Sequence, residues 1–112
     1  MAVVMIEVKY SAAAMAALVD MPENRAGPVG RAIEAAGLKL LGAFYINGTN
    51  KAIFLADGSL EDGNTIGVMA LAAGSAIEAE VKELTPFDKA QEYFRRAAKV
   101  KAIYRKPGEA RK

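Results

Sequence analysis

The chain has 112 residues, which suits one domain with a modest core, and 53% of them are apolar, too many for a disordered protein. It contains no cysteine and no histidine, which excludes disulfides and thiol chemistry and removes the usual general base and the commonest metal ligand, so we expect no metal site and no cofactor. The net charge of +2 is uneven, because residues 95–112 carry eight basic side chains against one acidic, and the rest carries seven basic against twelve acidic.

The N-terminal segment predicts a strand at Val3 to Tyr10, with Val4, Ile6, Val8 and Tyr10 on one fully apolar face. Its apolar run is too short for a signal peptide. No run in the chain approaches the roughly 18 to 20 apolar residues that a membrane span needs. We therefore expect a bacterial-type cytoplasmic protein with no membrane span.

Two helical pieces should follow this strand. Ser11 is a plausible N-cap for an alanine-rich helix over Ala12 to Val19. The segment Met21 to Asn24 contains a proline and interrupts that helix, and a second piece should run from about Pro28 to Ala36 before Gly37 ends it. The prediction is one bent or broken helical layer.

The centre of the chain predicts a β-hairpin. Strands over about Leu38 to Ile46 and Lys51 to Ala56 flank the turn Asn47-Gly48-Thr49-Asn50. Asn-Gly between two apolar runs is a strong hairpin signal, because both residues tolerate a positive φ. This glycine turn precedes no helix and lacks the spacing of a phosphate loop, so we interpret it as a hairpin rather than an anion site.

The last third predicts a helix, a strand and a final helix. Ser59 to Asp62 matches a capping box and opens a helix to about Ala73. Gly63 and Gly67 inside it mean that tertiary packing rather than propensity must hold this helix, or else they mark a close approach to a neighbouring backbone. A strand over Ser75 to Leu84 should place Ile77, Ala79 and Val81 on one face and Glu78, Glu80 and Lys82 on the other. Thr85-Pro86-Phe87-Asp88 then starts an amphipathic helix, whose apolar stripe consists of Phe87, Ala90, Phe94, Ala97 and Ala98, flanked by Tyr93, Val100 and Tyr104.

The order β-α-β-β-α-β followed by a helix predicts an α+β, ferredoxin-like antiparallel sheet with helices on one face. We expect a single domain over residues 1–106 and a disordered basic tail over 107–112. The other sheet face should be mixed, and two copies facing each other would form a dimeric α+β barrel with a partly charged lumen. That face should hold Met5, Glu7, Lys9, Lys39, Leu41, Ala43, Tyr45, Lys51, Ile53, Leu55, Glu78, Glu80 and Lys82.

From about Pro22 to Ala98 the chain resembles the GYD-domain proteins of the dimeric α+β barrel superfamily. Gly37, Lys39, Tyr45 and Gly48 align with that family's pattern, whereas Asn50 and Lys51 stand where its name-giving Tyr and Asp would fall. The resemblance implies the barrel fold and a homodimer. It also implies a site for hydrophobic or aromatic small molecules, used in some related barrels for oxygen insertion or isomerisation without a cofactor.

A lumen site is the first candidate for function, with Tyr45, Asn47, Lys51, Glu78 and Glu80 as the ligand-binding residues, joined by Asn50. Glu78 and Glu80 lie roughly 7 Å apart on one strand face, and such paired carboxylates could share a proton and supply a catalytic base. The simpler interpretation is that they form ion pairs with Lys9, Lys39, Lys51 and Lys82 across the sheet or the dimer.

The basic C-terminus is the second candidate, with Arg95, Arg96, Lys99, Arg105 and Lys106 as the partner-binding residues. A solvated tail favourable to the helix dipole is the simplest interpretation, and docking on an acidic partner or on another subunit is the next. Contact with nucleic acid or a membrane surface is the least favoured.

Arg25 and Arg31 form a third candidate, because they lie near the start of the second helical piece, where an arginine could bind a carboxylate or form a surface salt bridge.

Taken together, the sequence favours a non-catalytic homo-oligomeric barrel that binds a small ligand or serves as an accessory subunit of a larger assembly. The alternative is a cofactor-independent oxygenase or isomerase of a hydrophobic or aromatic molecule, with Glu78 or Glu80 as base.

Overall fold

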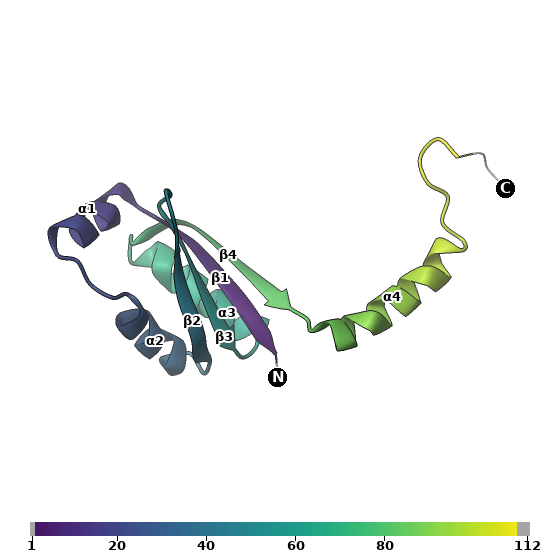
Figure 1. The fold of residues 1–112 in the computed structure, drawn as a ribbon, viewed down its shortest axis with the longest axis horizontal. Helices are drawn as coiled ribbons and strands as arrows, with labels where there is room; N and C mark the ends of the chain where they lie inside the picture. Colours follow the sequence, from purple (N-terminus) through teal and green to yellow (C-terminus); the bar gives the residue numbers. More distant parts are fainter. Residues whose placement is uncertain (1, 110–112) are drawn as a thin grey trace.

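A computed structural model describes residues 2–109 (Figure 1). Over these residues the chain forms four strands and four helices, and their order confirms the predicted α+β arrangement. The elements are β1 (Val3–Tyr10), α1 (Ala12–Asp20), α2 (Ala26–Ala35), β2 (Lys39–Ile46), β3 (Lys51–Asp57), α3 (Leu60–Ala72), β4 (Ala76–Leu84) and α4 (Phe87–Lys101).

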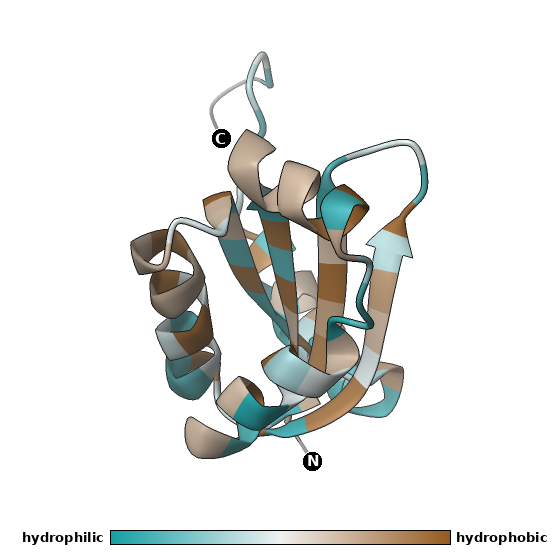
Figure 2. Cartoon of the chain, turned by 90° about the vertical axis from the view of Figure 1, so that its left-hand side faces the viewer, coloured by the Kyte–Doolittle hydropathy of each residue, from teal (hydrophilic) through white to brown (hydrophobic). Residues whose placement is uncertain are grey.

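The four strands form one antiparallel sheet in the order β2-β3-β1-β4, as in a ferredoxin-like fold. Its strands show the alternating bands of hydrophobic and hydrophilic residues expected when only one face is buried (Figure 2). The predicted apolar face of β1 is buried, and α1, α2 and α3 all contribute side chains to the core that it forms. Ile6 and Val4 of β1 and Ile33 of α2 are its largest fully buried side chains.

Helix α3 lies close to the sheet because two of its core-facing residues are glycines. A Cβ atom added at Gly63 would lie 2.9 Å from Cγ1 of Val81 and 3.3 Å from Cγ2 of Val4. A Cβ atom at Gly67 would lie 3.3 Å from Cγ2 of Val81. The glycines therefore serve packing within one chain, between α3 and strands β1 and β4.

The predicted break in the first helical layer is present between α1 and α2. Ser11 caps α1 through a 3.1 Å hydrogen bond that its hydroxyl accepts from the Ala14 amide. The layer resumes at Ala26, whose amide donates to the Asn24 side chain at 3.0 Å. The five residues between the two helices leave the sheet less covered here, which creates the cavity described below.

Both edge strands carry a β-bulge, and these bulges change two predicted faces. In β2 the register against β3 passes from Leu40 to Gly42, so Leu41 is an extra residue. The prediction that Ala43 and Tyr45 lie on the open face is therefore wrong, because they pair with Phe54 and Ala52 on the helix-covered face.

The second bulge lies where β4 meets the end of β1. Lys9 pairs with Glu78 but Tyr10 pairs with Ala76, which leaves Ile77 as the extra residue. Ala76 is buried in the core, whereas Ile77 is 56% exposed. The prediction that Ile77 shares the buried face of Ala79 and Val81 is therefore also wrong.

Helix α4 extends away from the rest of the molecule (Figure 1). The Cα radius of gyration is 18.7 Å, against about 13 Å for a compact domain of 100 residues. The predicted apolar stripe is consequently exposed, and Phe87 is 84% accessible to solvent. None of the helices described is long and apolar enough to span a membrane.

The end of the chain turns at Pro107 and Gly108, and the Glu109 side chain accepts a hydrogen bond from the Lys106 amide. The disordered tail predicted over residues 107–112 stays a prediction, and its last three residues lie outside the described part of the chain.

Candidate functional site

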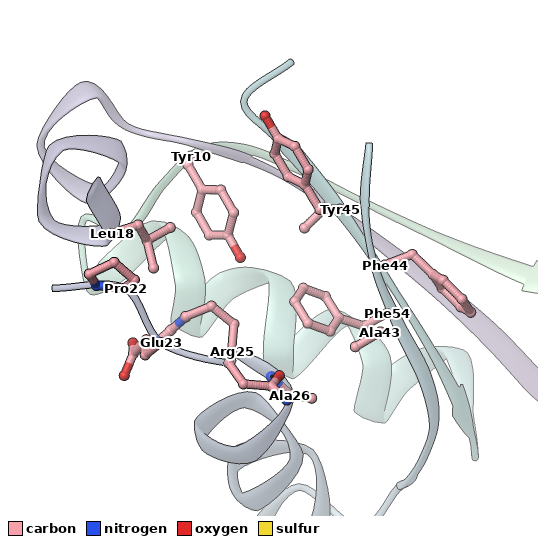
Figure 3. A pocket seen from close by; sticks show the side chains of 12 residues that line it. Tyr10, Leu18, Pro22, Glu23, Arg25, Ala26, Ala43, Phe44, Tyr45 and Phe54 are labelled. Carbon is pink, nitrogen blue, oxygen red and sulfur yellow. Dashed lines mark hydrogen bonds and ion pairs between the residues drawn. The ribbon is translucent and has the colours of Figure 1, made fainter. Parts of the chain in front are cut away.

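A cavity of about 330 Å³ lies between the sheet and the segment that joins α1 to α2 (Figure 3). Two neighbouring cavities, of about 410 and 230 Å³, share Tyr10 and Arg25 with it. The 330 Å³ of the first cavity is at the lower end of the range of about 300–1,000 Å³ found for small-molecule sites. The lining residues are Tyr10, Leu18, Pro22, Glu23, Asn24, Arg25, Ala26, Ala43, Phe44, Tyr45, Ala52 and Phe54.

Tyr10 forms the inner wall of this cavity. It is the last residue of β1 and only 6% exposed, and its hydroxyl points across the cavity toward Arg25 (Figure 3). Its backbone is fixed by Asn50, whose carbonyl accepts from the Tyr10 amide at 2.7 Å and whose side-chain amide donates to the Tyr10 carbonyl at 3.0 Å. Its hydroxyl interacts with the Arg25 guanidinium through a side-chain hydrogen bond that helps to raise the pKa of Arg25.

Arg25 supplies a positive charge to the cavity. Its Nη1 lies 2.7 Å from Oε1 of Glu23, and their side chains are 33% and 48% exposed. This hydrogen bond to Glu23 raises the pKa of the Arg25 guanidinium, whereas burial lowers that pKa. The charge of Glu23 and the nearby Tyr10 hydroxyl raise the pKa by smaller amounts. Arg25 is therefore charged at any pH at which the protein is folded.

The structure divides the predicted lumen residues between the two faces of the sheet. Tyr45 lines the cavity on the helix side, and its hydroxyl donates to the Thr49 carbonyl. Glu78 and Glu80 lie on the opposite, open face, where they pair in register with Lys9 and Glu7. Glu80 also lies 3.6 Å from Lys82 of the same strand, whereas the expected ion pairs were ones across the sheet or the dimer.

The predicted turn residues form a tight hairpin beside the cavity without lining it. Gly48 has a φ of +78°. Asn47 has a negative φ, because within the described range only glycines have a positive φ. Thr49 closes the turn, because its hydroxyl donates to the Ile46 carbonyl at 2.8 Å and accepts from the Lys51 amide at 3.0 Å. Lys51 pairs with Lys9 on the open face.

The predicted partner-binding residues lie on and beyond the detached helix α4. Arg95 and Arg96 both contact Glu92, at 3.3 and 3.6 Å, in exposed pairs that contribute little stability. Lys99 lies in the last turn of α4, where its charge favours the helix dipole. Arg105 and Lys106 follow the helix, and Arg105 donates to the Glu109 carbonyl.

Sequence reasoning singled out Arg25 but missed that it shares a cavity with Tyr10. The two residues are separated by a whole helix, so no spacing rule connects them. The available signal was the interruption at Met21 to Asn24, because a helical layer that breaks over a sheet leaves part of that sheet uncovered.

Comparison with known proteins finds similarity among solved structures. No protein-family model matches this chain, and no curated protein does. Among solved structures, it is similar to an uncharacterised NIPSNAP-domain protein from Burkholderia xenovorans, with 15% identity, a TM-score of 0.47, and coverage of 77% of this chain and 94% of that one.

It is also similar to two proteins from Agrobacterium tumefaciens. The first has 20% identity, a TM-score of 0.46, and coverage of 77% of this chain and 93% of that chain. The second, a NIPSNAP-family protein, has 15% identity, a TM-score of 0.45, and coverage of 76% and 91%. At this level of similarity the GYD-family resemblance stays a prediction.

Proposed function

We propose that this chain is a homo-oligomeric α+β protein that binds a small, largely apolar molecule between its helix layer and its sheet. The observation that supports this is the cavity of about 330 Å³, whose lining is mainly aliphatic and aromatic with a few polar groups directed into it. Ligand sites in proteins have this composition, because apolar walls supply affinity and a few polar groups fix orientation.

The proposed role is binding rather than catalysis. The groups that line the cavity include a phenol, a guanidinium already paired with a carboxylate, and the aromatic ring of Phe54. These groups can recognise and orient a ligand. The base of the alternative enzyme, Glu78 or Glu80, lies on the other side of the sheet, so it cannot act on a molecule held in this cavity.

The test is to fill the cavity from the edge strand. In the Ala43→Phe variant the new ring should occupy the cavity, whereas Ala13→Phe adds the same ring on the exposed surface of α1. We expect native mass spectrometry of protein purified gently from its own host to show a bound small molecule on the natural protein and on Ala13→Phe, but not on Ala43→Phe. Equal loading of the two variants, or no bound molecule on any of them, would contradict the proposal.

Self-association is proposed from the detached helix α4. An isolated helix of 15 residues is only marginally stable in water, so α4 needs a surface to cover its exposed Phe87, Phe94 and Val100. We propose that this surface belongs to a second copy of the chain, whose open sheet face exposes Leu41 and Phe44. The charges agree, because the C-terminal segment is basic and the rest of the chain carries more acidic than basic residues. Docking of α4 on a larger protein would instead make this chain an accessory subunit.

Truncation after Thr85 tests this docking. We expect the full chain to be a dimer or larger by size-exclusion chromatography with light scattering, and the truncated chain to be monomeric with its sheet intact by circular dichroism. A full chain that stays monomeric at high micromolar concentration, or a truncated chain that still dimerises, would refute the role of α4. If host-purified protein carries a second polypeptide in place of a second copy, the accessory-subunit interpretation would replace the homodimer.

A further inference from the structure

Glu23 and Arg25 are the charged side chains that line the 330 Å³ cavity, and they are paired with each other. The remaining lining is apolar or neutral. The chemistry of these two groups therefore decides which charge a ligand in this cavity can carry.

Arg25 has more donors than Glu23 uses. A guanidinium presents five N–H groups in a planar fork that matches a carboxylate through two parallel hydrogen bonds. In the structure the ion pair to Glu23 joins Nη1 and Oε1 at 2.7 Å. Tyr10 is only 6% exposed and presents its hydroxyl beside Arg25, and its O–H offers a further donor on the cavity side.

Glu23 is the more easily displaced partner. The Glu23 side chain is 48% exposed. Glu23 lies in the link between α1 and α2, two residues before Arg25. Two long side chains in such an exposed pair gain little from each other, so moving Glu23 into water costs little. An incoming carboxylate would replace one charge-assisted hydrogen bond with an equivalent one that lies deeper in the cavity.

We propose that the ligand of this cavity is a small organic monocarboxylic acid with an apolar body, whose carboxylate binds Arg25 and Tyr10 after displacing Glu23. Glu23 thus acts as an internal competitor for the ligand's carboxylate. The apolar body contacts Leu18, Phe54 and Ala43, which line the same cavity. This inference rests on the proposed function, because it names the chemical class that the proposed site selects.

The test measures affinity for acids and for their uncharged amides. The probes are phenylacetate and 4-methylpentanoate with the corresponding amides, titrated into the full-length protein by isothermal calorimetry or by protein NMR. We expect each acid to bind about tenfold more tightly than its amide, the scale of one charge-assisted hydrogen bond on a partly exposed group.

Two variants and two matched controls separate charge recognition from a change in the fold. Glu23→Gln removes the competitor and should tighten the binding of the acids about three- to tenfold, whereas Arg25→Gln should weaken it about tenfold. Neither change should alter the affinity of the amides. Glu61→Gln and Arg31→Gln make the same substitutions at helical positions that do not line the cavity, and both should bind like the natural protein.

The outcomes distinguish the two proposals. Amides that bind as tightly as the acids, or a Glu23→Gln variant that weakens acid binding, would overturn the assignment of a carboxylate ligand while leaving the cavity as a binding site. Failure of every acid and amide to bind would overturn both.

Discussion

The Gly63→Ala substitution probes the closest contact between a helix and the sheet. The added Cβ atom would lie 2.9 Å from Cγ1 of Val81, well inside the 3.5–4.0 Å at which carbon atoms pack best. Val81 is β-branched and has few alternative rotamers, and Val4 on the other side is fully buried. Helix α3 must therefore move outward. Such overpacking costs about 1–3 kcal/mol, and the better helix propensity of alanine returns at most about 1 kcal/mol.

We expect Gly63→Ala to lower the free energy of unfolding by about 1 kcal/mol and the melting temperature by about 4 °C. Gly67→Ala is the matched control, because its Cβ atom would approach Val81 only to 3.3 Å and Ala79 to 3.5 Å. Its propensity gain should offset the milder contact, which leaves stability within about 0.5 kcal/mol of the natural protein. Urea denaturation followed by circular dichroism measures both.

Coupling to Val81 identifies the cause. In a Val81→Ala background the contact with Cγ1 no longer exists, so Gly63→Ala should cost much less than in the natural protein, with a coupling of about 1 kcal/mol. A Gly63→Ala variant that is as stable as the natural protein, or one with the same cost in both backgrounds, would refute the reasoning.

Two further substitutions test local contacts. Ser59→Ala removes the hydroxyl that accepts a hydrogen bond from the Asp62 amide at 3.0 Å. Thermal denaturation should show a loss of about 1 kcal/mol in the free energy of unfolding, the usual loss at an N-cap, whereas Ser59→Asn should retain most of the stability. Asn50→Ala removes the donor to the Tyr10 carbonyl and should cost about 1–2 kcal/mol. Because Asn50 fixes the backbone of Tyr10, it should also weaken acid binding in the titration described above, and unchanged affinity would show that β1 holds Tyr10 without this contact.

The helices and strands could be predicted from the sequence because the residues that start and end them act locally. Ser11 and Ser59 act as the predicted N-caps, and Gly37, with a φ of +93°, lies just beyond the end of α2 as predicted. Each depends on a few neighbouring residues, whose backbone preferences decide where a helix begins or ends.

The predicted faces failed on one side of each bulge, at Ala43 and Tyr45 in β2 and at Ile77 in β4. A period of two assigns every residue to a face by counting, so one extra residue reverses all assignments after it. Gly42, directly after the bulged Leu41, was the available signal, since an isolated glycine in a strand often marks such an irregularity. Tyr45 therefore lines a cavity on the opposite side of the sheet from the predicted lumen.

The cavity and the placement of α4 depend on contacts between distant segments. The stripe that includes Phe94 predicted an amphipathic helix, but an apolar stripe does not specify which surface covers it. The cavity needs Tyr10 of β1 and Arg25, which directly precedes α2, to lie on either side of a gap in the helical layer. Only the three-dimensional arrangement of the sheet and its helices creates that gap.

The two bulges also bear on how the chain avoids aggregation. β2 and β4 are the edges of the sheet, and the backbone N–H and C=O groups of an edge can recruit strands from other molecules into fibrils. Leu41 and Ile77 interrupt the regular spacing on each edge strand, so an incoming strand cannot pair along its full length. Removing one bulged residue would give a longer, flatter edge, and the bulges therefore help to keep association specific rather than open-ended.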